Sequence, residues 1–173
     1  MIKPIIDLVF DHIKNAEEKR SPLSVILPGF HRSIQIDGYS CGAQCAYMIL
    51  KYYGKARSIK NVKKEAGTNE DGTESEPIKK LFRKRGLTVR EFSNGNLSRL
   101  ERAIDRNSPI LAHISTRKED HWVVVYGYDK DNIWVADPSL NVLKFSKRIW
   151  CSQKRSSFRK RWKGFGIVVG KTR

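Results

Sequence analysis

The chain has 173 residues, of which 39% are hydrophobic, and a formal net charge of +16 at pH 7. This length and apolar content predict one globular domain with a sizeable core and exclude a disordered chain. No apolar run approaches the roughly 20 residues that a membrane span needs, so we expect no membrane-spanning helix.

The high positive charge bears on possible partners. A surface this basic attracts RNA, DNA, anionic lipid or an acidic protein. A solvated basic face without any fixed ligand is equally consistent with the charge, which reports attraction and not function.

The cysteine content bears on the compartment and on metal binding. Cys41, Cys45 and Cys151 are an odd number and form no paired disulfide framework, so we expect a reducing, cytoplasmic environment. The pattern also lacks a second Cys-x-x-Cys and paired histidines, so we expect no zinc site and no cofactor.

The first 32 residues are expected to form a helical extension. Apolar residues recur at helical spacing over residues 2–20, and Ser21-Pro22 ends the pattern. Acidic residues dilute the lysines of its polar face, which favours packing on the domain over binding to a membrane surface. Residues 23–30 predict a short strand or loop. We therefore divide the chain into an extension, 1–32, and a main domain, 33–173, with a basic C-terminal segment.

Four helices and one strand are predicted next. The first helix begins at Cys41 and ends before Gly54; Ser58 caps the second, Gly86 ends the third, and Asn96 caps the fourth. Residues between the second and third helices form a turn-rich loop. The helices are expected over 41–53, 58–66, 76–85 and 97–107, and an alternating strand over 87–92.

The last part of the chain is rich in strands. They are expected over 109–114, 121–128, 132–136, 142–145 and 164–170, with a hairpin turn at 129–132. Helices first and antiparallel strands second predict an α+β fold, in which N-terminal helices pack on a C-terminal antiparallel sheet.

Cys41 is the candidate nucleophile. It begins a helix and precedes Gly42, and the positive end of a helix dipole favours the thiolate. The alternative is a buried structural cysteine, the usual fate of a free thiol. Cys45 lies one turn further along the same helix, and we expect it to belong to the core.

Three further side chains complete a candidate thiol acyl-transfer site. His121, which opens an apolar strand, can take the thiol proton, and Asp137 can orient its imidazole. Gln35, six residues before Cys41, can donate a hydrogen bond to an oxyanion. His113 competes for the role of base, but its apolar strand suggests a core position.

Strand register tests whether His121 and Asp137 can meet. With a two-residue turn at Lys130-Asp131, Asp137 would lie opposite Val124, on the other face of the sheet from His121. A longer turn or a bulge must therefore shift the register.

Five segments in order, 35–50, 67–86, 108–112, 121–125 and 136–138, resemble the bacteriocin-processing, double-glycine leader peptidase family, a branch of the papain-like cysteine proteases. The resemblance covers roughly residues 33–145. It implies a papain-like fold, a Cys41–His121–Asp137 triad with Gln35 as oxyanion donor, and a leader peptide cut after Gly-Gly. It also implies that the sixteen-residue interval from histidine to aspartate can be accommodated.

The basic segment leaves alternatives open. Residues 144–163 hold nine Lys or Arg and no acid, interleaved with Trp150, Phe158 and Trp162. Such a pattern can bind nucleic acid or an acidic protein partner or inhibitor, or the aromatics can anchor the segment to the core. The leading hypothesis is a papain-like cysteine peptidase or related thiol acyl-transfer enzyme with a peptide or protein substrate. The others are a nucleic-acid-directed protein or toxin on this scaffold, and an inactive peptide-binding relative.

Overall fold

The computed structural model describes residues 24–115, 120–139 and 153–172. Its centre is an antiparallel seven-stranded sheet with the strand order β2-β7-β3-β4-β5-β6, and β1 pairs with β4. The predicted α+β class is confirmed. The elements are β1 (Val25–Ile26), α2 (Cys41–Tyr52), α3 (Ile59–Glu65), α4 (Ser75–Lys84), β2 (Leu87–Phe92), α5 (Leu97–Ile104), β3 (Ile110–Ser115), β4 (Asp120–Tyr128), β5 (Asn132–Ala136), β6 (Gln153–Lys154), α6 (Arg155–Arg161) and β7 (Trp162–Lys171).

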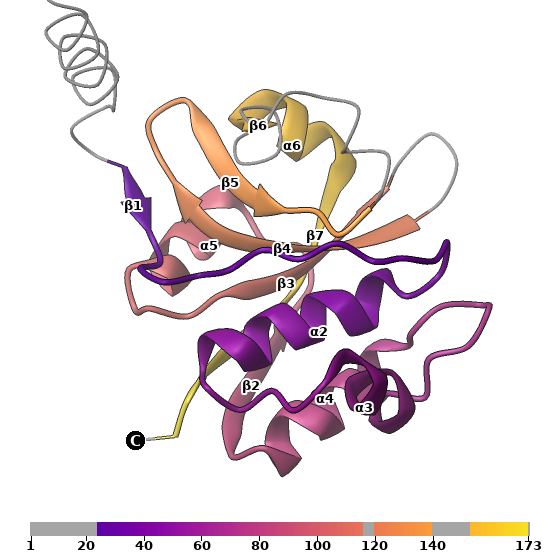
Figure 1. Ribbon diagram of the computed structural model, residues 1–173. Helices are drawn as coiled ribbons and strands as arrows, with labels where there is room; N and C mark the ends of the chain where they lie inside the picture. Colours follow the sequence, from indigo (N-terminus) through magenta and orange to yellow (C-terminus); the bar gives the residue numbers. More distant parts are fainter. Residues whose placement is uncertain (1–23, 116–119, 140–152, 173) are drawn as a thin grey trace, which may run out of the picture.

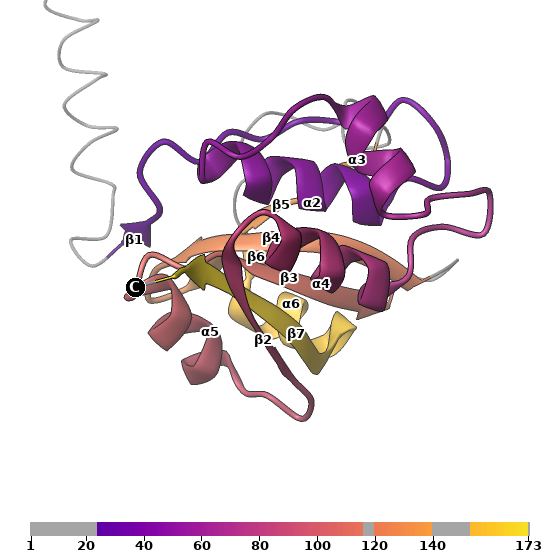
Figure 2. The ribbon, with the colours of Figure 1, turned by 90° about the horizontal axis from the view of Figure 1, so that it is seen from below.

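Helices cover both faces of the sheet. Helices α2, α3 and α4 lie on one face, and α5 and α6 lie on the other (Figures 1 and 2). Helix α5 agrees with the helix predicted over 97–107, whereas α6 was not predicted from the sequence. Because both faces are covered, the central strand β4 has a continuous apolar run, and Val123, Val124 and Val125 are fully buried.

Helix α2 is the buried helix of the fold. It packs against β4 on one side and against α3 and α4 on the other. Its side chains are small or apolar around most of its circumference, which is what a helix enclosed on several sides requires. Its fully buried residues are Ala43, Cys45, Ala46, Met48, Ile49 and Leu50.

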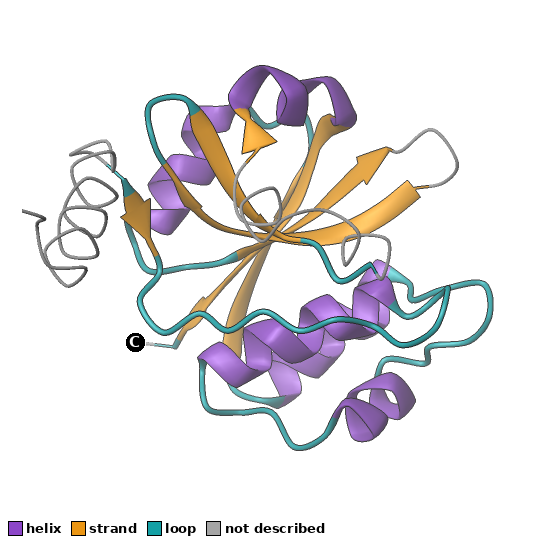
Figure 3. Ribbon diagram, turned by 45° about the horizontal axis from the view of Figure 1, so that its top comes forward, coloured by secondary structure: helices purple, strands orange, loops and turns teal. Residues whose placement is uncertain are grey.

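The segment between β1 and α2 runs alongside α2 (Figure 3). The amide of Gln44 donates from Nε2 to Ser33 Oγ over 2.6 Å, and the backbone N–H of Ser33 donates to Met48 Sδ. Within residues 23–30, for which a strand or a loop was expected, β1 forms a two-residue strand, and Leu27, which follows it, is buried in the core. The division of the chain at residue 32 stays a prediction.

The hairpin of β4 and β5 contains the register shift that the sequence analysis required. Tyr128 pairs with Ile133, and Val125 pairs with Val135, so Tyr126 is an extra residue on β4. The shift sets Val124 opposite Ala136, one residue before Asp137. Asp137 therefore follows on the same side of the sheet as His121, because side chains alternate along a strand.

The basic C-terminal segment is anchored by its aromatic residues where it is described. Phe158 is fully buried and Trp162 is 5% exposed, with ring centroids 5.6 Å apart. These two rings are therefore not free to stack on nucleic acid bases. The expected helix over 2–20, the strand over 142–145, Trp150 and Cys151 lie outside the described residues. Within the described part of the chain, no helix is both long and apolar enough to cross a membrane.

Candidate active site

The carboxylate of Asp37 stabilises the loop that precedes Cys41. Asp37 Oδ1 accepts hydrogen bonds from the backbone N–H groups of Tyr39 and Ser40 at 3.1 and 2.7 Å, and its Oδ2 pairs with Lys63 of α3 at 2.5 Å. Burial alone would raise the pKa of Asp37, but these hydrogen bonds, led by that of Lys63, lower it to about 2. The ion pair with Lys63 thus holds the loop against α3, and the loop positions Cys41 at the start of α2.

The two cysteines of α2 have different environments. Cys41 is the first residue of the helix and is partly exposed, whereas Cys45 is fully buried and its Sγ donates to the carbonyl of Trp122 over 3.3 Å. Burial raises the pKa of the Cys45 thiol, and nearby Cys41 and Asp137 add to the effect. The prediction that Cys45 belongs to the core is confirmed.

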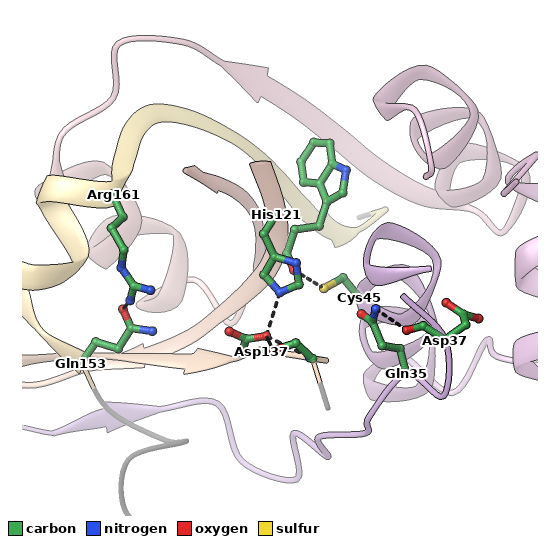
Figure 4. Close-up of polar contacts among 9 residues, drawn as sticks. Gln35, Asp37, Cys45, His121, Asp137, Gln153 and Arg161 are labelled. Atoms are coloured by element: carbon green, nitrogen blue, oxygen red, sulfur yellow. Dashed lines mark hydrogen bonds and ion pairs between the residues drawn. The ribbon is translucent and has the colours of Figure 1, made fainter. Parts of the chain in front are cut away.

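His121 and Asp137 form a hydrogen-bonded pair. His121 Nε2 lies 2.7 Å from Asp137 Oδ1, and Figure 4 shows the two side chains pointing toward each other. Burial alone would lower the pKa of His121, but hydrogen bonds to Asp137 and to Cys41 raise it to about 10. With Nε2 engaged by Asp137, the Nδ1 side of the ring is left for the thiol of Cys41.

Asp137 is itself held in place. Its Oδ1 also accepts from the backbone N–H and from Oγ of Ser139, at 2.9 and 2.8 Å. Burial alone would raise the pKa of Asp137. The hydrogen bond to His121, the positive charge of His121 and the hydrogen bonds from Ser139 together lower that pKa. The carboxylate stays charged beside the imidazole and can stabilise its protonated form.

Gln35 lies close to the same site. Its backbone N–H donates to the carbonyl of Pro138 over 2.8 Å, which joins the segment before α2 to the segment after β5. Its Nε2 donates to the carbonyl of Asp37 over 2.8 Å, and an amide nitrogen has a second N–H (Figure 4). The side chain is 5% exposed, so this second N–H is held in a largely water-free setting.

A cavity of about 430 Å³ opens beside Cys41. The loop 71–75 lines it, and so does Trp122, whose Nε1 donates to the carbonyl of Thr73 over 3.1 Å. His113, Asp120 and Phe165 also line the cavity. His113 was weighed as a competing base and placed in the core, and Asp120 and Phe165 were not singled out from the sequence, because β3–β4 and β3–β7 pairing brings the three together from distant positions.

His113 corrects one expectation. We expected it in the core, but it is only half-buried, and its ring packs on that of Trp122 with centroids 4.7 Å apart. Burial lowers the pKa of His113, against the opposing charge of Asp120. A neutral imidazole therefore lines the cavity beside Cys41.

The glycine after the nucleophile is required by packing. A Cβ atom at Gly42 would lie 2.9 Å from Thr73 Cβ and 2.9 Å from Trp122 Cδ1. Only glycine lets α2 approach the two cavity walls this closely. Within the described residues, no group of three or more His, Cys, Asp or Glu is arranged to hold a metal ion.

Comparison with known proteins gives the context of this geometry. The model of the peptidase C39 family matches residues 30–173. The lactococcin-G-processing and transport ATP-binding protein LagD of Lactococcus lactis is 40% identical over 131 residues, which are 75% of this chain and 17% of LagD. The transport/processing ATP-binding protein ComA of Streptococcus pneumoniae is 30% identical over 140 residues, 80% of this chain and 18% of ComA. The chain thus spans less than a fifth of the length of these relatives.

Solved structures show the same fold. The peptidase domain of Streptococcus ComA superposes with a TM-score of 0.67 at 23% identity, covering 83% of this chain and 99% of that domain. A double glycine motif protease from an AMS/PCAT transporter, solved with its leader peptide, has a TM-score of 0.63 at 20% identity, covering 82% and 91%. The expected papain-like architecture is therefore confirmed, and because the family model matches residues 30–173, the chain belongs to the peptidase C39 family of cysteine peptidases.

Proposed function

We propose that this chain hydrolyses a peptide bond with Cys41 as the nucleophile, His121 as the general base and acid, and Asp137 as the residue that orients His121. The observation that carries the proposal is the 2.7 Å contact of His121 and Asp137, on an imidazole whose pKa is raised by Asp137 and by Cys41. Three side chains from separate segments thus form one continuous relay, as nucleophilic catalysis by a thiol requires.

The reaction follows from this relay. In the resting pair His121 already carries the proton of the Cys41 thiol. The thiolate attacks the scissile carbonyl, and the carbonyl oxygen becomes an oxyanion. Collapse of this intermediate breaks the C–N bond, and the imidazolium of His121 donates its proton to the leaving amine. Water, deprotonated by His121, then attacks the thioester and releases the acid and the free thiol.

Gln35 is the proposed side-chain donor to the oxyanion, together with the backbone N–H of Cys41. The free N–H of its amide supports this role, because the other is already engaged by Asp37 and fixes the amide. First-turn N–H groups of α2 have no partner within the helix and can also face an anion. One such donor contributes about 3–4 kcal/mol to transition-state stabilisation in comparable sites.

The proposed substrate is a leader peptide that ends in two glycines. The support comes from relatives, since LagD is named as a lactococcin-G-processing protein and the AMS/PCAT protease was solved with a leader peptide. We also propose that the reaction takes place in the cytoplasm, because a thiol nucleophile must stay reduced. The charge of +16 supports an acidic protein partner or inhibitor.

Cleavage of a synthetic leader peptide tests this proposal. A peptide with Gly-Gly before the scissile bond is expected to be cut after the second glycine, as read by mass spectrometry. Cys41→Ala should abolish cleavage, whereas Cys45→Ala, one turn away and outside the relay, should retain it. Cleavage that survives in Cys41→Ala would overturn the mechanism, and equal cleavage of an Ala-Ala peptide would overturn the substrate.

A further inference from the structure

A second cavity lies on the face of the sheet opposite α2. It has a volume of about 240 Å³ and is lined by residues of β2, of β7 and of the segment formed by α5 and the residues after it. The positions of α5, β2 and β7 can be followed in Figure 2. Four arginines line it, with the ring of Phe92 and the side chain of Val168 between them: Arg90, Arg99, Arg102 and Arg106. We call this cavity the arginine groove.

Helix α5 and the two residues that follow it place their arginines at the groove and their acids elsewhere. Arg99, Arg102 and Arg106 recur at helical spacing and all line the groove. The two acids of the same segment are engaged elsewhere, because Glu101 pairs with Arg155 of α6 and Asp105 accepts from the Tyr128 hydroxyl over 2.7 Å.

Strand β2 contributes in the same way. Arg90 and Phe92 lie on the groove side of the strand, whereas Glu91 between them pairs with Lys79 of α4 at 2.5 Å on the other side. The acids nearest in sequence to the four arginines are thus committed to other cations or to a hydroxyl. Within the described residues, none of the four arginines forms an ion pair.

The groove is also partly ordered for binding. The guanidinium of Arg99 lies 4.5 Å from the ring centroid of Phe92, a cation–π contact that orients its fork. Phe92 is 5% exposed and its ring forms an apolar base beneath the charges. Four like charges around one small cavity repel each other, so an anion between them lowers the electrostatic energy.

The type of cation indicates the type of anion. Lysines outnumber arginines in the chain, 19 to 15, yet every cation that lines the groove is an arginine. A guanidinium presents planar pairs of N–H donors that match phosphate oxygens, whereas an ammonium acts as a point charge. The cavity is smaller than the roughly 300–1,000 Å³ of sites for drug-sized ligands, which fits a phosphate or diphosphate group.

We propose that the arginine groove binds phosphate groups, at a site separate from the peptidase site. The inference does not depend on the peptidase mechanism, because no residue of the groove belongs to the candidate active site. The phosphate can belong to a small molecule or to a nucleic acid strand, and both present the same oxygens to the four guanidinium groups.

Titration of the full chain with pyrophosphate, read by amide NMR shifts and calorimetry, tests the proposal. We expect saturable binding with shifts confined to β2, β7 and α5, and at least tenfold weaker binding in Arg102→Gln/Arg106→Gln. The matched control is Arg57→Gln/Arg83→Gln, which removes the same charge from two exposed arginines away from the groove and should change affinity less than twofold. Arg99→Lys/Arg102→Lys keeps the charge and should still weaken binding, because the planar forks are lost.

Competition between pyrophosphate and a short RNA distinguishes the two possible sources of the phosphate. If pyrophosphate displaces a bound short RNA, and the groove substitutions weaken RNA binding, the phosphate source is a nucleic acid strand. If pyrophosphate binds and the RNA does not, the source is a small molecule. The proposal is overturned if millimolar pyrophosphate shows no saturable binding, or if the control pair loses as much affinity as the groove pair. It is also overturned if polyglutamate competes as well as pyrophosphate, since the groove would then bind carboxylates.

Discussion

His121 is held between a carboxylate and a thiol, and these two contacts decide its charge. Burial lowers the pKa of an imidazole, yet the contacts with Asp137 and Cys41 raise that of His121 to about 10. The ring is therefore protonated through the neutral range. This is the form that the proposed mechanism needs to protonate the leaving amine, and it is the form that a neighbouring thiolate stabilises.

Asp137→Asn should move the alkaline limit of catalysis to lower pH. Removing the carboxylate charge removes a cause that raises the pKa of His121, while burial, which lowers that pKa, remains. In the wild type, kcat/KM should fall as pH rises through about 10. In Asp137→Asn this limb should lie at lower pH, and the maximal kcat/KM should fall by about 10²-fold. The pH profile of peptide cleavage measures both effects.

Ser139→Ala is the control for this change. It removes one hydrogen bond to Asp137 but keeps the carboxylate, so its alkaline limb should stay close to that of the wild type. An unchanged limb in Asp137→Asn would contradict the role given to that aspartate.

Gly42→Ala should damage both stability and activity. The added Cβ would overlap Thr73 and the Trp122 ring, which form walls of the cavity beside Cys41. We expect a loss of about 1–3 kcal/mol in the free energy of unfolding, typical of overpacking, and a fall in kcat/KM because the walls move. Gly38→Ala in the preceding loop is the matched control, since its Cβ would meet nothing within 4 Å. Urea unfolding and peptide cleavage of both variants measure these effects. Equal stability and equal activity of the two variants would contradict the packing requirement at Gly42.

At the scale of elements, local signals predicted the helices well. Ser58 and Asn96 cap α3 and α5 through hydrogen bonds to the backbone N–H groups of Asn61 and Arg99, as expected from the sequence. The predicted helix bounds agree with the structure to within three residues at each end. Capping and glycine termination act within a few residues, so a single sequence contains them.

Long-range pairing was less predictable. The need for a shift in register between β4 and β5 could be derived, but its position at Tyr126 depends on neighbours far away in the chain. There the backbone carbonyl of Tyr126 accepts from Leu27, and its ring stacks on Phe30 at 4.9 Å. Likewise, His113 reaches the cavity only through pairing with Trp122, which no local pattern reports.

Helix α3 acts as a support for the loop before Cys41, through Lys63. Lys63→Met keeps most of the side-chain length but removes the ion pair with Asp37. We expect a loss of about 1 kcal/mol in the free energy of unfolding and a several-fold fall in kcat/KM, because the loop also fixes Gln35. Lys64→Met, on the same helix and exposed, should leave both quantities unchanged. If the two variants behave alike in urea unfolding and in cleavage, α3 does not support the site.

At the scale of the whole molecule, charge is unevenly distributed. Among the residues that the structure describes, the charged residues lining the cavity beside Cys41 are Asp71, Glu74 and Asp120, whereas those lining the arginine groove on the other face are all arginines. A chain of net charge +16 thus presents a locally acidic cleft at its candidate active site. The two faces are suited to ligands of opposite charge, and the net charge alone could not predict this division.

Three charged groups at or near the candidate active site, Asp37, Asp137 and His121, set the pH range in which the molecule is most stable. The pKa of Asp37, lowered to about 2, and that of Asp137, also lowered, contribute stability that is complete above about pH 4 and is lost as pH falls through the folded values. The pKa of His121, raised to about 10, contributes stability that is complete below about pH 6.5 and is lost as pH rises toward 10. Stability should therefore be greatest between these limits.

Urea unfolding followed from pH 3 to pH 9 should give a midpoint that is highest between about pH 4 and 6.5 and falls on both sides. Asp37→Asn should lower the plateau and flatten the acid side, because the group that takes up a proton on unfolding is gone. Asp137→Asn should flatten the alkaline side, because the pKa of His121 moves toward its unfolded value. Added salt should relieve the general repulsion among the 34 Lys and Arg at low pH and leave the difference between Asp37→Asn and the wild type largely intact. A midpoint that rises steadily to pH 9 would contradict the raised pKa of His121 and, with it, the buried ion pair on which the proposed mechanism depends.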